Sequence, residues 1–317
     1  MVLVFALFAL ITSIACYFMV SMPSFTVVMA IIWGASLIVG GLYIAQRAML
    51  VLYIINILLL YGLAGGSALF FYLTFFGLAA FVMSFMAGSQ RDYYKLQRAG
   101  ILIAVLGVSF FIGVVYFSSG GAGIAMMEDE VNNYLTGFMK EYEDSGMVEF
   151  YERQGITKAE LEAKISDFGS TLAKHLPAFY YLQALFAVFF MLLSASYMSM
   201  KGSVKQMPKR PFDQEIMPWQ FTWLVILGLA LWLWGKEYVS PIIYVGSNIL
   251  IVLVPITVYF GLSTAVFKLK RQKPGGRKWM ITVLLVLAVV FPLPVILFLS
   301  LLGLFDSLFD YRKLGEE

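Results

Sequence analysis

Long apolar segments dominate this sequence and limit what it can fold into. A helix needs about 20 apolar residues to cross the hydrocarbon core of a bilayer, and nine segments meet or nearly meet that length. They are residues 2–21, 24–45, 48–65, 67–88, 99–118, 176–200, 218–235, 239–267 and 279–303. The pattern predicts an all-α polytopic transmembrane helical bundle of about nine spans. Eight or ten spans stay open, because only Gly65-Gly66 separates two segments and 218–235 is short.

Composition supports a membrane protein and limits its partners. The 317 residues are 61% hydrophobic and 13% charged, whereas soluble domains carry about 25% charged residues. The lipid bilayer is therefore the first expected partner. The net charge of +3 is spread over short loops, which argues against nucleic acid as a partner. One cysteine, Cys16, cannot form an internal disulfide or a thiolate cluster.

Lysine and arginine in short loops predict the orientation of the chain. The positive-inside rule places such loops in the cytoplasm. Their basic residues are Arg47, Arg91, Lys95, Arg98, Lys201, Lys205, Lys209, Arg210, Lys268, Lys270, Arg271, Lys273, Arg277 and Lys278. With nine spans, all four loops fall on one side of a bacterial cytoplasmic (inner) membrane. The N-terminus is then cytoplasmic and the C-terminus lies outside.

The apolar pattern predicts three regions. Residues 1–118 form an N-terminal transmembrane group of five helices, and residues 176–317 form a C-terminal group of four helices plus an amphipathic tail. Between them, residues 119–175 carry eleven Asp and Glu against five Lys and Arg, and they form an extracytoplasmic helical insertion. Apolar residues at helical spacing, broken at Ser145-Gly146, predict two amphipathic helices there. Thr157 and Glu160 have the spacing of a capping box at the start of the second.

The predicted spans carry no Asp, Glu, Lys or Arg near their centres. An intramembrane charge is the usual sign of an ion relay or a catalytic group, and acid–base catalysis and metal sites need such side chains. We therefore expect no enzyme activity, no metal site and no cofactor.

Two amides inside spans are the candidate ligand-binding residues. Asn56 and Asn248 each need a hydrogen-bond partner within lipid. That partner is either another helix, in a purely structural contact, or a small molecule held in a pocket between helices.

The C-terminal tail carries the candidate interaction residues. Asp306 and Asp310 are four residues apart, and Arg312 follows closely. Together with neighbouring Leu and Phe residues they predict a short amphipathic helix at the membrane interface with local ion pairs. Such a helix serves either as an anchoring end-cap or as a docking element for a partner.

The same tail carries a family resemblance. Residues 301–314 read Leu-Leu-Gly-Leu-Phe-Asp-Ser-Leu-Phe-Asp-Tyr-Arg-Lys-Leu after a proline-broken helix. This segment resembles the end of the YybS-like family of predicted bacterial multi-pass membrane proteins, whose function is uncharacterised. The order of parts is also similar: five spans, an outer insertion, a basic inner loop and a C-terminal helical group.

The N-terminal half is similar, more loosely, to two other groups. These are the substrate-binding subunits of energy-coupling-factor vitamin transporters and the small membrane proteins of the cell-shape machinery. The resemblance implies a bundle of about six helices and a vitamin-like ligand held between them. The transporter subunits dock through an alanine-x-x-x-alanine face, where this chain has Ala9 and Ser13.

Two functions follow from these observations. One is small-molecule binding, related to transport, to which the resemblance adds weight. The alternative is a non-enzymatic membrane scaffold or accessory protein that acts through contacts with a membrane protein partner, which fits the lack of buried charge in the spans.

Overall fold

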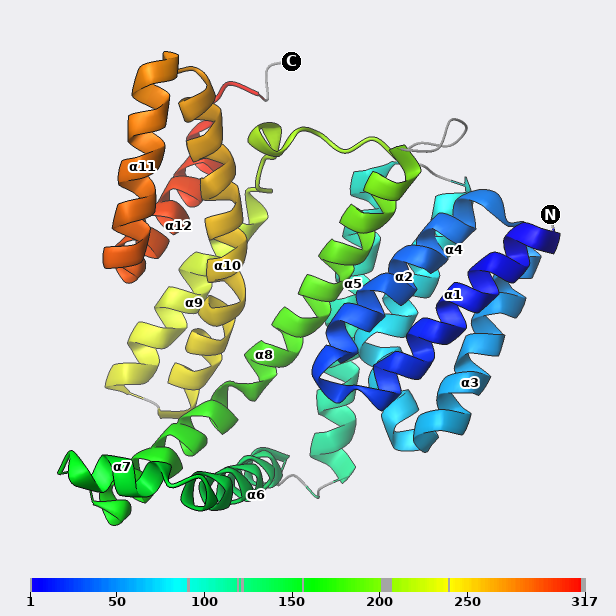
Figure 1. Ribbon diagram of the computed structural model, residues 1–317. Helices are drawn as coiled ribbons and strands as arrows, with labels where there is room; N and C mark the ends of the chain where they lie inside the picture. The colour runs from blue at the N-terminus through cyan, green and yellow to red at the C-terminus, as the bar shows by residue number, and fades with distance from the viewer. Residues whose placement is uncertain are drawn as a thin grey trace. The chain divides into compact units, whose positions relative to one another are not determined.

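A computed structural model describes residues 2–89, 92–118, 120, 123–155, 157–200, 207–238 and 240–314. Every regular element in these ranges is a helix, which confirms the predicted all-α fold class. The chain divides into two compact units, unit 1 from Met1 to Lys209 and unit 2 from Arg210 to Glu317 (Figure 1). Three of the basic loop residues used to predict orientation lie outside the described ranges: Arg91, Lys201 and Lys205.

The described residues of unit 1 form eight α-helices. They are α1 (Val2–Ser21), α2 (Thr26–Tyr43), α3 (Gln46–Tyr72), α4 (Leu78–Ser89), α5 (Tyr93–Ser118), α6 (Gly123–Asp144), α7 (Met147–Arg153) and α8 (Lys158–Met200). A π-helical turn, η2 (Leu73–Gly77), joins α3 to α4. Helix α2 is central, because it packs against α1, α4 and α8. The last part of α8 therefore belongs to unit 1, and the units divide after residue 209. The three regions with boundaries at 118 and 175 stay a prediction.

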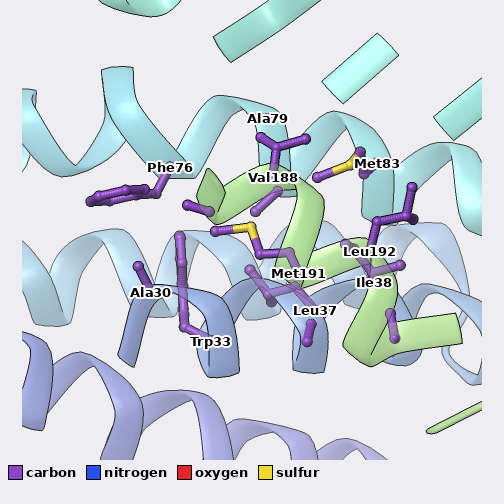
Figure 2. Close-up of a cluster of buried hydrophobic side chains, with 14 of the residues drawn as sticks. Ala30, Trp33, Leu37, Ile38, Phe76, Ala79, Met83, Val188, Met191 and Leu192 are labelled. Carbon is purple, nitrogen blue, oxygen red and sulfur yellow. The ribbon is translucent and has the colours of Figure 1, made fainter. Parts of the chain in front are cut away.

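Small residues on α2 explain its central place. Figure 2 shows Trp33, Leu37 and Ile38 of α2 in one cluster with side chains of α8 and α4. A Cβ added at Gly34 would lie 2.3 Å from Sδ of Met191 on α8. Such close approach is how small residues pack membrane helices, where apolar burial gives no driving force.

The glycine pair that the sequence marked as a span boundary does break the helix. Residues 46–89 form one apolar helical segment of 44 residues, which would be about 66 Å long if straight, roughly twice the thickness of a hydrocarbon core. Gly65 has φ 77° and ψ −180°, a backbone region open essentially to glycine alone. The chain bends there into two legs, as the predicted division between 48–65 and 67–88 requires.

The acidic insertion is helical, with one boundary that differs from the prediction. Helix α6 ends at Asp144, and Gly146 follows with φ 73°. The Thr157 backbone N–H donates to the Glu160 carboxylate at 3.0 Å, and the Glu160 N–H donates to Thr157 Oγ1 at 3.3 Å, which confirms the capping box. The helix that starts there does not end at residue 175, the predicted boundary of the insertion. It continues through Pro177 as the 43-residue α8.

In its described residues, unit 2 has four α-helices, α9 (Gln220–Glu237), α10 (Ser240–Lys270), α11 (Pro274–Val290) and α12 (Pro292–Phe309). Helix α10 packs against α9 and α12. At the α10–α12 contact the backbones nearly touch, since a Cβ at Gly261 would lie 1.8 Å from the Leu299 carbonyl oxygen.

The predicted single span 279–303 is two helices. Phe291 leaves helical geometry (φ −128°, ψ 64°) directly before Pro292, and proline cannot donate the helical hydrogen bond needed to continue α11. Figure 1 shows α11 and α12 as a hairpin. The end of α12 returns to the end of α10, where Lys268 Nζ lies 5.8 Å from the centre of the Tyr311 ring. The C-terminal tail is thus at the same end of unit 2 as loop 271–273, whereas nine spans would have placed it at the opposite end.

Seven helical segments in the described ranges are long and apolar enough to cross a membrane. They are Val2–Ser21, Pro23–Tyr43, Gln46–Ser89, Tyr93–Ser118, Lys158–Met200, Ile242–Lys270 and Pro292–Phe309. With the bend at Gly65, these give six membrane-length legs in unit 1.

Candidate functional site

Asn56 lies at the centre of a polar cluster inside unit 1. Its side chain is fully buried. Its Oδ1 accepts hydrogen bonds from Trp33 Nε1 at 3.1 Å and from Cys16 Sγ at 3.2 Å. Its Nδ2 donates to the Leu52 carbonyl at 2.7 Å and to Thr12 Oγ1 at 3.2 Å. Three helices, α1, α2 and α3, therefore meet at one amide.

The hydrogen-bonding capacity of this amide is used up. A primary amide has two acceptor lone pairs and two donor hydrogens, and each of the four has a partner within the chain. The predicted structural contact between helices is thus present at Asn56. The prediction that it also binds a ligand stays untested.

Asn248 stands apart from this cluster, on α10 in unit 2. Its Nδ2 donates to the Tyr244 carbonyl one turn earlier in the same helix, at 2.7 Å. The side chain is half-buried. The two predicted ligand-binding amides therefore belong to different units.

The second polar cluster centres on Arg312, near the end of unit 2. The Arg312 side chain is 1% exposed and that of Asp306 is 4% exposed. Nε and Nη2 of Arg312 both donate to Oδ2 of Asp306, at 2.9 and 2.7 Å. Nη1 donates to the Asp213 carbonyl at 2.8 Å and to Ser263 Oγ at 2.9 Å, and Nη2 also donates to the Glu215 carbonyl at 2.6 Å.

These five bonds match the five N–H donors of a guanidinium. Lysine has three donors on a single nitrogen and cannot reproduce the planar fork. Oδ1 of Asp306 is buried without a hydrogen-bond partner. A carboxylate in that position depends on the arginine, since removing one member of a buried ion pair leaves an uncompensated charge.

Asp310 shapes the turn that brings Arg312 back to the helices. It follows the last residue of α12 and has φ 42°, a left-handed conformation that Asp tolerates better than most residues. Its carboxylate accepts the Leu314 N–H at 3.1 Å, and its carbonyl accepts the Lys313 N–H at 2.9 Å. Asp306 therefore lies on α12, Asp310 ends this helix and Arg312 follows in the turn. The predicted local ion pair is present between Arg312 and Asp306, and a docking role for these residues stays a prediction.

An ion pair borders this cluster. Lys270 Nζ, at the end of α10, lies 2.7 Å from Oδ1 of Asp213. The hydrogen bond from Lys270 lowers the pKa of Asp213 below its ordinary value, with a smaller contribution from the charge of Arg312. Both groups lie at the end of unit 2 that carries the basic loop.

Sequence reasoning missed the residues that receive Arg312. Asp213, Glu215 and Ser263 lie far from it along the chain, and two of them contribute a backbone carbonyl, which no residue pattern reveals. The one available signal was the arginine itself, placed after an apolar helix and close to two aspartates.

A comparison with models of known protein families assigns the chain to one family. The family model described as "Predicted membrane protein (DUF2232)" matches residues 7–307, so the chain belongs to this family of predicted membrane proteins. No curated protein and no solved structure matches. Among the described residues, no group of three or more His, Cys, Asp or Glu could hold a metal ion.

Proposed function

We propose that the protein is a non-enzymatic scaffold or accessory protein of the membrane, which acts through protein contacts in the bilayer. The observation that carries this proposal is the closed hydrogen-bond set of Asn56. A polar group that recognises a ligand needs a donor or acceptor left for it. At Asn56 all four positions are engaged by the chain itself, which favours a role in holding three helices together.

Helix α11 supports the same function. None of its described residues is buried, whereas α9, α10 and α12 each bury several side chains. Its exposed residues include Leu285 and Val289, at 63% and 83%. An apolar helix held so lightly by its own unit offers its exposed face to a transmembrane helix of a partner, where van der Waals packing gives the affinity.

The basic ends of the two units suggest one orientation. In unit 2, loop 271–273 and the C-terminal tail lie at the same end, with Lys268, Lys270 and Arg271. In unit 1, Lys209 Nζ lies 5.8 Å from the ring of Tyr93, the first residue of α5. By the positive-inside rule we place these ends in the cytoplasm of a bacterial cell, with α6 and α7 on the outer side.

Small-molecule binding is the second candidate, and one observation favours it. Unit 1 has six membrane-length legs, as the resemblance to vitamin-binding transport subunits implies. Such a protein would hold a vitamin-like ligand between the helices and the outer insertion. The two candidates predict different companions for the protein after gentle extraction from its membrane. A scaffold would be isolated with a protein partner, and a binding protein with a small molecule.

A surface substitution on α11 tests the scaffold. The double variant Leu285→Trp/Val289→Trp enlarges two exposed side chains without changing the buried packing of unit 2. On a native gel after gentle solubilisation, the unmodified protein should migrate in a complex larger than one chain, and the variant should migrate as the single chain. Leu10→Trp, at a 60% exposed position on α1, is the control and should keep the complex. Migration of the unmodified protein as a single chain would contradict the proposal.

A further inference from the structure

The place of Arg312 gives the C-terminal tail a second role, independent of the proposed function. The two backbone carbonyls it holds, at Asp213 and Glu215, belong to the segment with which unit 2 begins, a few residues after the last residue of unit 1. We propose that the C-terminal tail is a latch that fixes the entry segment 211–217 against α10 and α12, and that release of the tail frees the joint between the two units.

The contacts around the entry segment support a latch rather than ordinary helix packing. The segment contains one short 3-10 turn, η3 (Phe212–Gln214), and otherwise extended backbone that cannot hold itself by its own ladder of hydrogen bonds. Three of its carbonyls accept hydrogen bonds from outside the segment. Ser263 Oγ on α10 donates to the Phe212 carbonyl at 2.6 Å, and Arg312 donates to the carbonyls of Asp213 and Glu215.

Arg312 and the Asp213 side chain are themselves paired with residues of α12 and α10. The charge of Arg312 is balanced by Asp306 on α12, and Lys270 on α10 is paired with the Asp213 side chain. One guanidinium therefore connects α12, α10 and the entry segment. Without it, the Asp213 carbonyl loses its Arg312 donor, and the Glu215 carbonyl keeps only the longer bond from Ser263 Oγ at 3.2 Å. Hydration of the segment then becomes more favourable.

Labelling of an introduced cysteine measures the release. Met217 is 2% exposed at the end of the entry segment. We expect Met217→Cys to react slowly with a water-soluble maleimide, and about tenfold or more faster when Arg312→Gln is added, since loss of one partner of a buried pair is strongly destabilising. Arg312→Lys should also accelerate labelling, because it keeps the charge but not the five-donor fork.

Two internal references keep the outcome unambiguous. Lys313→Gln removes the neighbouring exposed cation and should leave the labelling rate of Met217→Cys unchanged. The native Cys16, fully buried in unit 1, should stay unreactive in every variant. An unchanged rate in Arg312→Gln would overturn the latch. So would a parallel rise at Cys16, because the arginine would then support the whole fold rather than the joint.

Discussion

Asn56 and Arg312 show the same physical solution at the scale of single residues. Each is a polar group with several hydrogen-bonding positions in a buried place, and each has every position filled by its own unit. An unsatisfied polar group is costly where water is absent. Residues of this kind therefore stabilise a membrane fold only when all of their hydrogen-bonding positions have partners.

Replacing Asn56 should destabilise unit 1. In Asn56→Leu, Thr12 Oγ1 and Trp33 Nε1 lose their partner across the helix interface, and we expect a loss of about 1–3 kcal/mol of unfolding free energy. Thermal unfolding in detergent measures it. Thr282→Val is the control, because the exposed Thr282 hydroxyl donates one turn back in its own helix, to the Lys278 carbonyl at 3.1 Å. It should change stability by about 0.5 kcal/mol or less, and equal losses in the two variants would refute this account.

Low pH should destabilise the end of unit 2 that contains Asp213. Its pKa is lowered by Lys270, so the folded state favours the charged carboxylate. The resulting stability is present above the ordinary aspartate value of 3.8 and is lost as pH falls through the lower folded pKa. Melting temperatures measured from neutral pH downward should fall less steeply below that value in Lys270→Met than in the unmodified protein. Lys273→Met should behave as the unmodified protein, and identical pH profiles for all three proteins would exclude the ion pair as a contributor.

At the scale of helices and turns, the backbone break at Gly65 divides one apolar segment into two legs. Its φ of 77° with ψ −180° is open essentially to glycine. Gly62, one turn earlier, lies in regular helix, and an added Cβ would meet no atom within 4 Å at either position. The two glycines therefore differ only in backbone conformation.

Alanine at these two positions separates the effects. Gly65→Ala should cost about 1–3 kcal/mol through backbone strain, whereas Gly62→Ala should be neutral or stabilising by up to about 1 kcal/mol, as alanine is the better helix former. Thermal unfolding compares them directly. If both variants melted at the same temperature, the break at Gly65 would not be a strained turn.

Local rules explain which elements were predictable. The capping box at Thr157 and the break at Gly65 depend on residues close in the sequence, and both are present as predicted. The hairpin of α11 and α12 was not predictable, because Pro292 and Pro294 fit a kink within one span as well as a reversal. The partners of Arg312 lie 97 and 99 residues away for the two carbonyls, beyond the reach of any spacing rule.

For the whole molecule, the hairpin changes the expected course of the chain. The tail returns to the end of unit 2 that carries the basic loop, so the C-terminus and that loop should lie on one side of the membrane. Cysteines introduced at Gly276 and Lys313 should react with an impermeant maleimide from the same side of sealed vesicles. Labelling of the two cysteines from opposite sides would support the nine-span topology instead.

The central claim, that this membrane protein works through protein contacts, is tested most directly by native mass spectrometry of the protein taken gently from its own membranes. The account predicts the mass of the chain joined to a stoichiometric protein partner, with no recurring small-molecule adduct. A recurring adduct on the single chain, lost in Asn56→Leu and retained in Asn248→Leu, would contradict it and establish a ligand-binding protein.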